Sequence, residues 1–471
     1  MAMDALGEPP APSKLANIIL WLLLLVVAWA PIPFGSNRPW AWSFLALCIG
    51  ALMLLWAIGA VFDATLVQLS WGRYRPLFIL FFLFIGWSVY QAIGPAPQSW
   101  WAPAWQRMAD ALHEPATGVI SNTPEKSLTA IMRLLAYAGI FWISLQLGRR
   151  TRCAKAVLWS VIVATLGYAI YGLIVQFTGG GTILWFSKWS YGGVVTATFV
   201  NRNHFAIYAG IGILCTLALI ADQTRQATEA SIATRSGFIQ LLDNMSLQMV
   251  ILAITFMILA TALLLTQSRP GAVMTVAGIF VFLAVLATTS TFAAKSVVRF
   301  GLVILVAGLI FGLISGSLLA SRIVDVAENL TDRITVFKTT WHAILDRPFL
   351  GFGLGSFASV FPGYRGTEFS PNDPTYDYAH NIYLELALES GLPGALLLLL
   401  TVALAVGVCI WGAQQRHRNG YFPALGVAVT ALVGAHGLVD FSLQIPAIAA
   451  VYCLILGVAY SQAWSTVASA R

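Results

Sequence analysis

Long apolar runs recur along this 471-residue sequence, and they limit what it can fold into. Hydrophobic residues make up 59% of the chain and charged residues only 10%, whereas soluble domains carry about 25% charged residues. A helix of about 20 apolar residues crosses a bilayer. The sequence therefore predicts an all-α, polytopic integral membrane helical bundle. Its twelve predicted spans are residues 16–34, 40–60, 76–94, 128–148, 155–177, 203–221, 247–266, 271–290, 298–319, 391–411, 422–440 and 446–464.

The positions of Lys and Arg orient these spans. An even number of spans puts both termini on one side. With the termini inside, 14 of the 26 Lys and Arg residues lie in inner segments, and five of the other 12 lie in the long outer loop 320–385. Long loops count little toward the positive-inside rule, and the short basic loop GRRTRCAK fits the inner side. We therefore expect cytoplasmic termini, with loop 320–385 forming a partly helical cap on the outer face.

Net charge and cysteine usage exclude several function classes. The formal charge of +7 is explained by membrane topology, so no nucleic-acid partner is expected. Four of the five cysteines lie in apolar runs and no CxxC pair occurs, so neither disulfides nor a cysteine metal site are expected. The first apolar run lacks a small-residue cleavage site and is expected to remain as the first helix.

The stretch TFVNRNHFA (198–206) opens the sixth span with Asn201, Arg202, Asn203 and His204. An asparagine caps a helix well at such a position. Arg202 beside a helix N-terminus favours an anion site, because free N–H groups and a guanidinium point the same way. The alternative is an arginine that snorkels to a lipid phosphate.

The turn TQSRPGA (266–272) joins the seventh and eighth spans. Pro270 suits the first helical position, which places Arg269 at the membrane edge. Charged residues at this depth tend to face a cavity or a partner. The planar fork of Arg269 suits bidentate contact with phosphate, and a structural salt bridge is the alternative.

A third polar cluster, YDYAHNIYLELALESGLPG (376–394), leads into the tenth span. His380 and Asn381 begin a helical stretch at the junction between the long loop and the membrane. Glu385 and Glu389, four residues apart, share another face of that helix. Two interpretations stay open for them: a solvated helix face, or a site for a metal or a basic partner.

The remaining polar features lie in HGLVDFSLQIPA (436–447) and in the long loop. Asp440 is an acid at an outer helix end, where it would orient a histidine, pair with an arginine or cap a turn. TDRITVFKTTWHAIL predicts an amphipathic helix, whose apolar positions are Ile334, Phe337, Trp341 and Ile344. GFGLGSF follows no strand and precedes no GKS or GKT, which disfavours a nucleotide loop.

In this order, the four clusters and the long loop resemble the O-antigen ligase and polymerase superfamily. The resemblance covers roughly residues 195–450 and rests on FVNRNHFAIY, LTQSRPGA, WHAILDRPFLGFGLGSF, AHNIYLELALESGLPG and VDFSLQIPA. The N-terminal half resembles the family in hydropathy only. We therefore divide the chain into five N-terminal spans (1–177) and an O-antigen ligase-like membrane domain of seven spans (178–471).

The resemblance implies a metal-independent glycosyltransferase of the GT-C type without a cofactor. Such enzymes transfer a glycan from undecaprenyl diphosphate at the periplasmic face of the bacterial inner membrane. By match to the family's motifs, Arg202 and Arg269 are expected to bind the diphosphate and His380 to act as the catalytic base. A neutral imidazole suits a sugar hydroxyl as acceptor. The expected supporting residues are Asn201, Asn203, Asn381 and Asp440.

Several alternatives remain open from the sequence. A lipid A core as acceptor would make the protein a ligase, and another lipid-linked repeat would make it an O-antigen or exopolysaccharide polymerase. Ligase is favoured because all three functional positions have matches. A secondary transporter would place its charges near mid-span, whereas here they cluster at one face. A scaffold in an envelope assembly complex is a further possibility, and the roles of loop acids Asp373 and Asp377 stay open.

Overall fold

A computed structural model of the chain describes residues 13–113, 117–232, 246–288, 323–369, 375–416 and 418–464. Eleven of the twelve predicted spans are helices within these residues, which confirms the helical membrane bundle; the predicted span 298–319 lies outside them. The helices are α1 (Lys14–Trp29), α2 (Pro39–Phe62), α3 (Trp71–Ile93), α5 (Pro124–Leu147), α6 (Thr151–Phe177), α7 (Arg202–Ile232), α9 (Leu247–Leu265), α10 (Arg269–Ala287), α14 (Ile382–Gln415), α15 (Tyr421–His436) and α16 (Pro446–Gln462).

Length and exposure show why these helices suit a bilayer. Eight of the described helices are long and apolar enough to cross a membrane, and α1, α15 and α16 are shorter apolar helices. Large hydrophobic side chains face outward, as on α2, where Leu47, Leu54 and Val61 recur every seven residues and are 69%, 62% and 78% exposed. Such a surface is stable against lipid chains and unstable in water.

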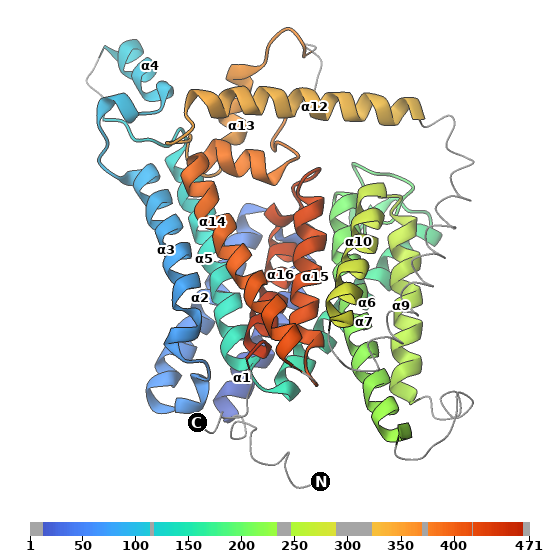
Figure 1. The fold of residues 1–471 in the computed structure, drawn as a ribbon. Helices are drawn as coiled ribbons and strands as arrows, with labels where there is room; N and C mark the ends of the chain where they lie inside the picture. The colour runs from blue at the N-terminus through green and yellow to red at the C-terminus, as the bar shows by residue number, and fades with distance from the viewer. Residues whose placement is uncertain are drawn as a thin grey trace.

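Helix α7 forms the centre of the bundle. It packs against α6, α9, α10 and α15, and 94% of the most apolar window of α7 is buried. Small residues let the backbones approach: a side chain at Gly271 of α10 would meet Ala206 of α7. Helix α5 packs along α16 and α3 along α14, so helices from both halves of the sequence share one bundle (Figure 1).

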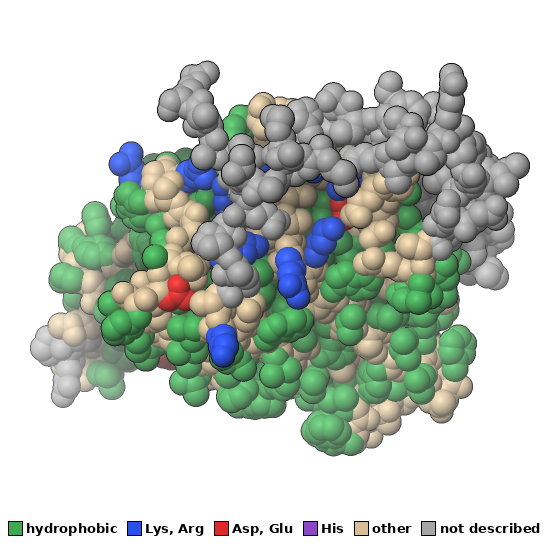
Figure 2. All heavy atoms as spheres, turned by 90° about the horizontal axis from the view of Figure 1, so that it is seen from below, with side chains coloured by type: hydrophobic (Ala, Val, Ile, Leu, Met, Phe, Trp, Pro, Cys, Tyr) green, Lys and Arg blue, Asp and Glu red, His purple; other side chains and the backbone are tan. Residues whose placement is uncertain are grey.

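The end of the bundle that the sequence predicts to be cytoplasmic gathers several helix ends. Gln146 at the end of α5 accepts a hydrogen bond from the backbone N–H of Gln68, and Arg149 donates to the carbonyl of Ser461 near the end of α16. Lys and Arg side chains are grouped on this face (Figure 2). Burial and the charges of Arg73 and Arg416 lower the pKa of Arg149 to about 10. This end carries the clustered positive charge that the sequence predicts for the inner side.

The opposite end of the bundle, which is predicted to be the outer one, is covered by the predicted cap. Helix α12 (Ile323–Asp346) lies across the outer ends of the bundle, followed by α13 (Phe357–Val360) and the 3₁₀-helix η5 (Phe361–Tyr364) (Figure 1). The prediction of which face of α12 is buried is partly wrong. Ile334 and Trp341 are 42% and 44% exposed, whereas Val336 and Ala343 are buried together with Ile344. Because α12 carries apolar side chains on two sides, helical periodicity alone does not identify the side that packs against the protein.

The other elements of the described residues are short. The outer loops carry α4 (Pro103–Leu112) and a hairpin of two-residue antiparallel strands that the sequence did not predict. The strands are β1 (Thr182–Ile183) and β2 (Phe186–Ser187), and the 3₁₀-helices are η1 (Phe34–Ser36), η2 (Ala64–Leu66), η3 (Gln98–Trp100) and η6 (Ser442–Gln444).

A break in α14 explains the glycine-rich stretch. Gly391 has φ 72°, which interrupts the helix where the predicted tenth span begins. The N–H groups of Phe352 and Gly353 donate to the carbonyls of Leu388 and Glu389, at 3.0 and 2.8 Å. Gly353 has φ +92° and lies against Ser121, a position that leaves no room for a side chain. GFGLGSF is therefore a structural loop that satisfies the carbonyls freed at the break.

Candidate functional site

The site is built around Asp440, a fully buried carboxylate in the turn between α15 and η6. Asn203 Nδ2 donates to its Oδ2 at 2.6 Å, and the N–H of Phe441 donates to its Oδ1 at 2.7 Å. His204 Nε2 lies 3.7 Å from Oδ1, which is a charge contact rather than a hydrogen bond. Burial raises the pKa of the Asp440 carboxyl, but His204 and the other nearby histidines outweigh it, so this pKa lies below its usual range. Asp440 is therefore a fixed negative charge.

The ring of Phe441 joins three side chains of the site. Its centroid lies 4.9 Å from that of His204, 5.0 Å from that of His380 and 4.1 Å from that of Tyr378, on which it stacks. The turn that holds Asp440 thus brings the start of α7 and the start of α14 together, although they are far apart in the sequence.

His380 stands just before α14, and one of its ring nitrogens is buried without a hydrogen-bond partner among the described residues. It is half-buried, and its Nδ1 has no hydrogen-bond partner in the part of the chain that the structure describes. Burial lowers the pKa of His380, while the charge of Asp440 opposes this shift. The imidazole is therefore neutral near pH 7 and able to accept a proton.

Asn381 sets the entry of the chain into α14. Its Oδ1 accepts from the N–H groups of Tyr383 and Leu384, at 3.0 and 3.1 Å, and its Nδ2 donates to the carbonyl of Leu438. Asn381 is thus an N-cap that also ties the helix to the Asp440 turn. It supports His380 by fixing its backbone.

Arg202 and Arg269 occupy the same position on two neighbouring helices, the first residue of α7 and of α10. The helix starts are joined because Ser268 Oγ donates to Asn203 Oδ1 at 2.7 Å. Asn201 Oδ1 accepts from the N–H of Asn203, as expected of a capping asparagine. Two helix N-termini, each with an arginine, therefore lie side by side, an arrangement suited to an anion.

Both guanidiniums are accessible. Arg202 is half-buried and its guanidinium lies 5.6 Å from the centroid of the Tyr191 ring, while Arg269 is exposed. Neither forms an ion pair with any residue that the structure describes. The structural salt bridge considered for Arg269 is therefore not seen in these parts of the chain.

Two residues of the site escape sequence reasoning. Arg333 of α12 donates through Nη1 to the carbonyl of Val439 at 2.5 Å, linking the cap to the Asp440 turn. His436 is fully buried at the end of α15 and its Nδ1 lies 3.1 Å from Ser442 Oγ. Nothing in the sequence separates Arg333 from the other basic residues of its loop, whereas His436, four residues before Asp440, carried a helical-spacing signal.

The interpretation of Glu385 and Glu389 as a solvated helix face is wrong. Both side chains are buried, at 3% and 7% exposure. Glu385 accepts from the N–H of Ala379 and from Gln444 Nε2, and Glu389 accepts from the N–H of Phe357. A second segment covers each carboxylate, which a helical pattern does not reveal.

Metal ligands are sparse in the described ranges. No group of three or more His, Cys, Asp or Glu side chains there is placed to hold a metal ion. Of the two loop acids, Asp377 is exposed and Asp373 lies outside the described residues. Independence from metal stays a prediction.

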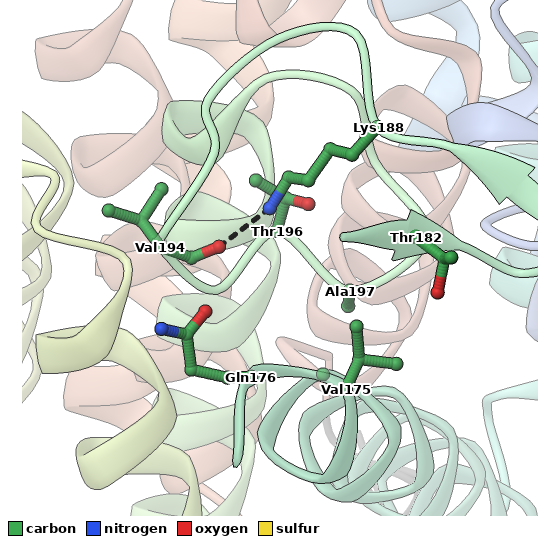
Figure 3. Close-up of a pocket in the computed structure, with 8 residues that line it drawn as sticks. Val175, Gln176, Thr182, Lys188, Val194, Thr196 and Ala197 are labelled. Atoms are coloured by element: carbon green, nitrogen blue, oxygen red, sulfur yellow. Dashed lines mark hydrogen bonds between the residues drawn. The ribbon is translucent and has the colours of Figure 1, made fainter. Parts of the chain in front are cut away.

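A small hollow of about 180 Å³ lies between α6 and the loop before α7 (Figure 3). Lys188 Nζ donates to the carbonyl of Val194 at its rim, at 2.7 Å, and burial lowers the pKa of this amine. Thr196 and Ala197 line the hollow, a few residues before Arg202. None of the predicted site residues lines it, so it is separate from the Asp440 cluster.

Comparison with known proteins finds one similarity, which covers part of the chain. Residues 254–399 match the family model described as O-antigen ligase. This part of the chain is similar to the O-antigen ligase family. The matched segment contains Arg269, His380 and the cap, whereas Arg202 and Asp440 lie outside it. No curated protein matches the chain.

The family match supports a coarse function. The O-antigen ligase family comprises glycosyltransferase-like membrane enzymes, and it implies lipid-linked glycans as substrates within a bilayer. Glycan transfer of the ligase or polymerase type is thereby supported, in agreement with the sequence motifs.

Proposed function

We propose that this protein transfers a glycan from undecaprenyl diphosphate to a hydroxyl of a lipid A core, at the periplasmic face of the bacterial inner membrane. The observation that carries the proposal is the Asp440 turn, through which His380 and the two arginine-bearing helix starts are joined. The proposed base, His380, and the proposed anion site at Arg202 and Arg269 then lie on either side of the Asp440 turn.

In the proposed reaction the acceptor oxygen attacks the anomeric carbon of the donor sugar. A new carbon–oxygen bond forms there while the bond to the diphosphate oxygen breaks, and undecaprenyl diphosphate leaves with the bonding electrons. The hydroxyl proton passes to His380. Because burial lowers the pKa of His380, this imidazole is in the basic form at neutral pH.

Charge that develops on the leaving diphosphate would be stabilised by Arg202 and Arg269. The two positive helix N-termini add to this effect, and preorganised donors act more strongly where water is scarce. Asp440, held by Asn203, keeps a negative charge beside the histidines. It stabilises the imidazolium that forms when His380 takes the proton.

Purified protein in detergent tests the proposal with an undecaprenyl-diphosphate glycan and two acceptors, a lipid A core and a second lipid-linked repeat. EDTA is present throughout. His380→Ala is compared with His342→Ala, since His342 is an exposed histidine on α12. We expect transfer to the core, lost in His380→Ala and retained in His342→Ala.

The two acceptors separate the alternatives. A ladder of longer lipid-linked chains in place of core modification would make the protein a polymerase. No transfer to either acceptor from a matched donor would overturn the proposal and favour transport. Reporter fusions at the C-terminus test the proposed cytoplasmic location of that end.

A further inference from the structure

Glu385 carries two hydrogen bonds that frame His380. It lies in the first turn of α14, and its side chain is 3% exposed. Its Oε2 accepts from the N–H of Ala379 at 2.8 Å, and its Oε1 accepts from Gln444 Nε2 at 2.7 Å. The hydrogen bond to Oε2 fixes the backbone of Ala379, the residue directly before His380.

His380 has an unusual backbone conformation that needs such support. Its φ of 53° lies in the left-handed region, which side-chain-bearing residues rarely adopt. The backbone is held from both sides: Glu385 binds the N–H of Ala379, and Asn381 caps the helix that follows. Together they set the direction in which the imidazole leaves the chain.

Gln444 anchors the other end of this arrangement. It belongs to η6, four residues after Asp440, and its backbone carbonyl accepts from Arg133 Nη2 of α5 at 2.6 Å. The Arg133 guanidinium lies 5.3 Å from the ring of Trp42. Glu385 therefore ties the segment that carries His380 to the segment that carries Asp440, and Arg133 ties both to the N-terminal helices.

We propose that Glu385 is a positioning residue, which acts with Gln444 to hold His380 in register with Asp440. The inference rests on the proposed function, because it assigns Glu385 a role in the same reaction. Both oxygens of the Glu385 side chain accept hydrogen bonds from the protein and are buried, so an acceptor hydroxyl has no access to them. Two ionisable groups act on the Glu385 side chain: the guanidinium of Arg133, which attracts a negative charge, and the second acid, Glu389, which repels it.

An exchange of the two side chains tests the positioning role. In Glu385→Gln the amide has one acceptor oxygen for two donors, and its own N–H₂ faces that of Gln444. We expect kcat to fall by about ten- to a hundredfold with KM for the donor nearly unchanged, as for misplaced catalytic groups. In the double variant Glu385→Gln with Gln444→Glu, the amide oxygen still accepts from Ala379 and the reversed pair restores the second hydrogen bond. We expect kcat to recover, which a loss of general stability would not produce.

The control is Glu125→Gln, an exposed acid in the first turn of α5 that we expect to leave kcat unchanged. The rate at which diethyl pyrocarbonate modifies His380, read by mass spectrometry, gives a second measurement that needs no turnover. We expect a changed rate in Glu385→Gln and the original rate in the double variant. If Glu385→Gln alone does not fold, the folded double variant decides: activity supports the role and inactivity overturns it.

The two proposals fail in different ways. A wild-type protein that transfers glycan, with a Glu385→Gln variant unchanged in both kcat and His380 labelling, would overturn the positioning role alone. A wild-type protein that transfers nothing would overturn the proposed function. In that case the labelling rate still decides whether Glu385 sets the placement of His380.

Discussion

Removal of the Asn203 side chain probes the centre of the site. Asn203→Ala deletes a hydrogen bond to the buried carboxylate of Asp440 and the acceptor for the Ser268 hydroxyl. A hydrogen bond to a charged group contributes about 1.5–3 kcal/mol and a neutral one about 0.5–1.5 kcal/mol. We therefore expect Asn203→Ala to lower the free energy of unfolding by about 2–4 kcal/mol, most of it because Asp440 is left under-satisfied.

The free energy of unfolding can be measured by titration with SDS, followed by tryptophan fluorescence. Asn122→Ala is the control, because Asn122 makes an exposed side-chain hydrogen bond to Ser359 at 3.2 Å. We expect this control to cost less than about 1 kcal/mol. In a double-mutant cycle, Asn203→Ala and Asp440→Asn should be less than additive, since each removes the same contact. A cost for Asn203→Ala equal to that of the control, or a fully additive cycle, would refute this account of the site.

Three further perturbations have defined outcomes. Arg202→Lys and Arg269→Lys keep the positive charge but lose the planar guanidinium, so each should lower kcat/KM for glycan transfer about tenfold or more. Unchanged kcat/KM in both variants would show that the arginines do not bind the diphosphate. The rate of glycan transfer should decline as the pH falls through the pKa of His380, which lies below the usual pKa of an imidazole. Because the charge of Asp440 raises the pKa of His380, Asp440→Asn should move this decline in the pH–rate profile to lower pH. Gly353→Ala should destabilise the protein by about 1–3 kcal/mol in the SDS titration, since φ is +92° there; full stability would contradict the packing of the glycine loop.

The transmembrane helices were predictable because burial in lipid needs only length and apolarity. The helix starts were predictable for a similar local reason: Asn201 and Asn381 are capping residues, and their hydrogen bonds are made within three positions of the chain. The cap helix was predictable from its period. Its covered face was not, because Trp341 and Ile344 are both apolar and only tertiary packing separates them.

The contacts that assemble the site could not be predicted. Asn203 and Asp440 are 237 positions apart, and no local pattern states that they pair. The burial of Glu385 depends on Gln444, 59 positions later, so a helical wheel shows an ordinary charged face. The two arginines carried a signal because each lies at a helix start and matches a family motif. Nothing in the sequence shows that the two helix starts are joined by the Asn203–Ser268 hydrogen bond.

The break in α14 has a consequence for how the protein is made. The loop that contains Phe352 and Gly353 leaves the ribosome before α14, yet its hydrogen-bond partners are the carbonyls of Leu388 and Glu389. Gln91 of α3, synthesised much earlier, also donates to the carbonyls of Leu350 and Glu389. The loop therefore cannot reach its final structure until α14 has been inserted beside α3. Completion of the outer face is therefore a late event in biogenesis, and faults in the glycine loop would appear only after α14 has been inserted.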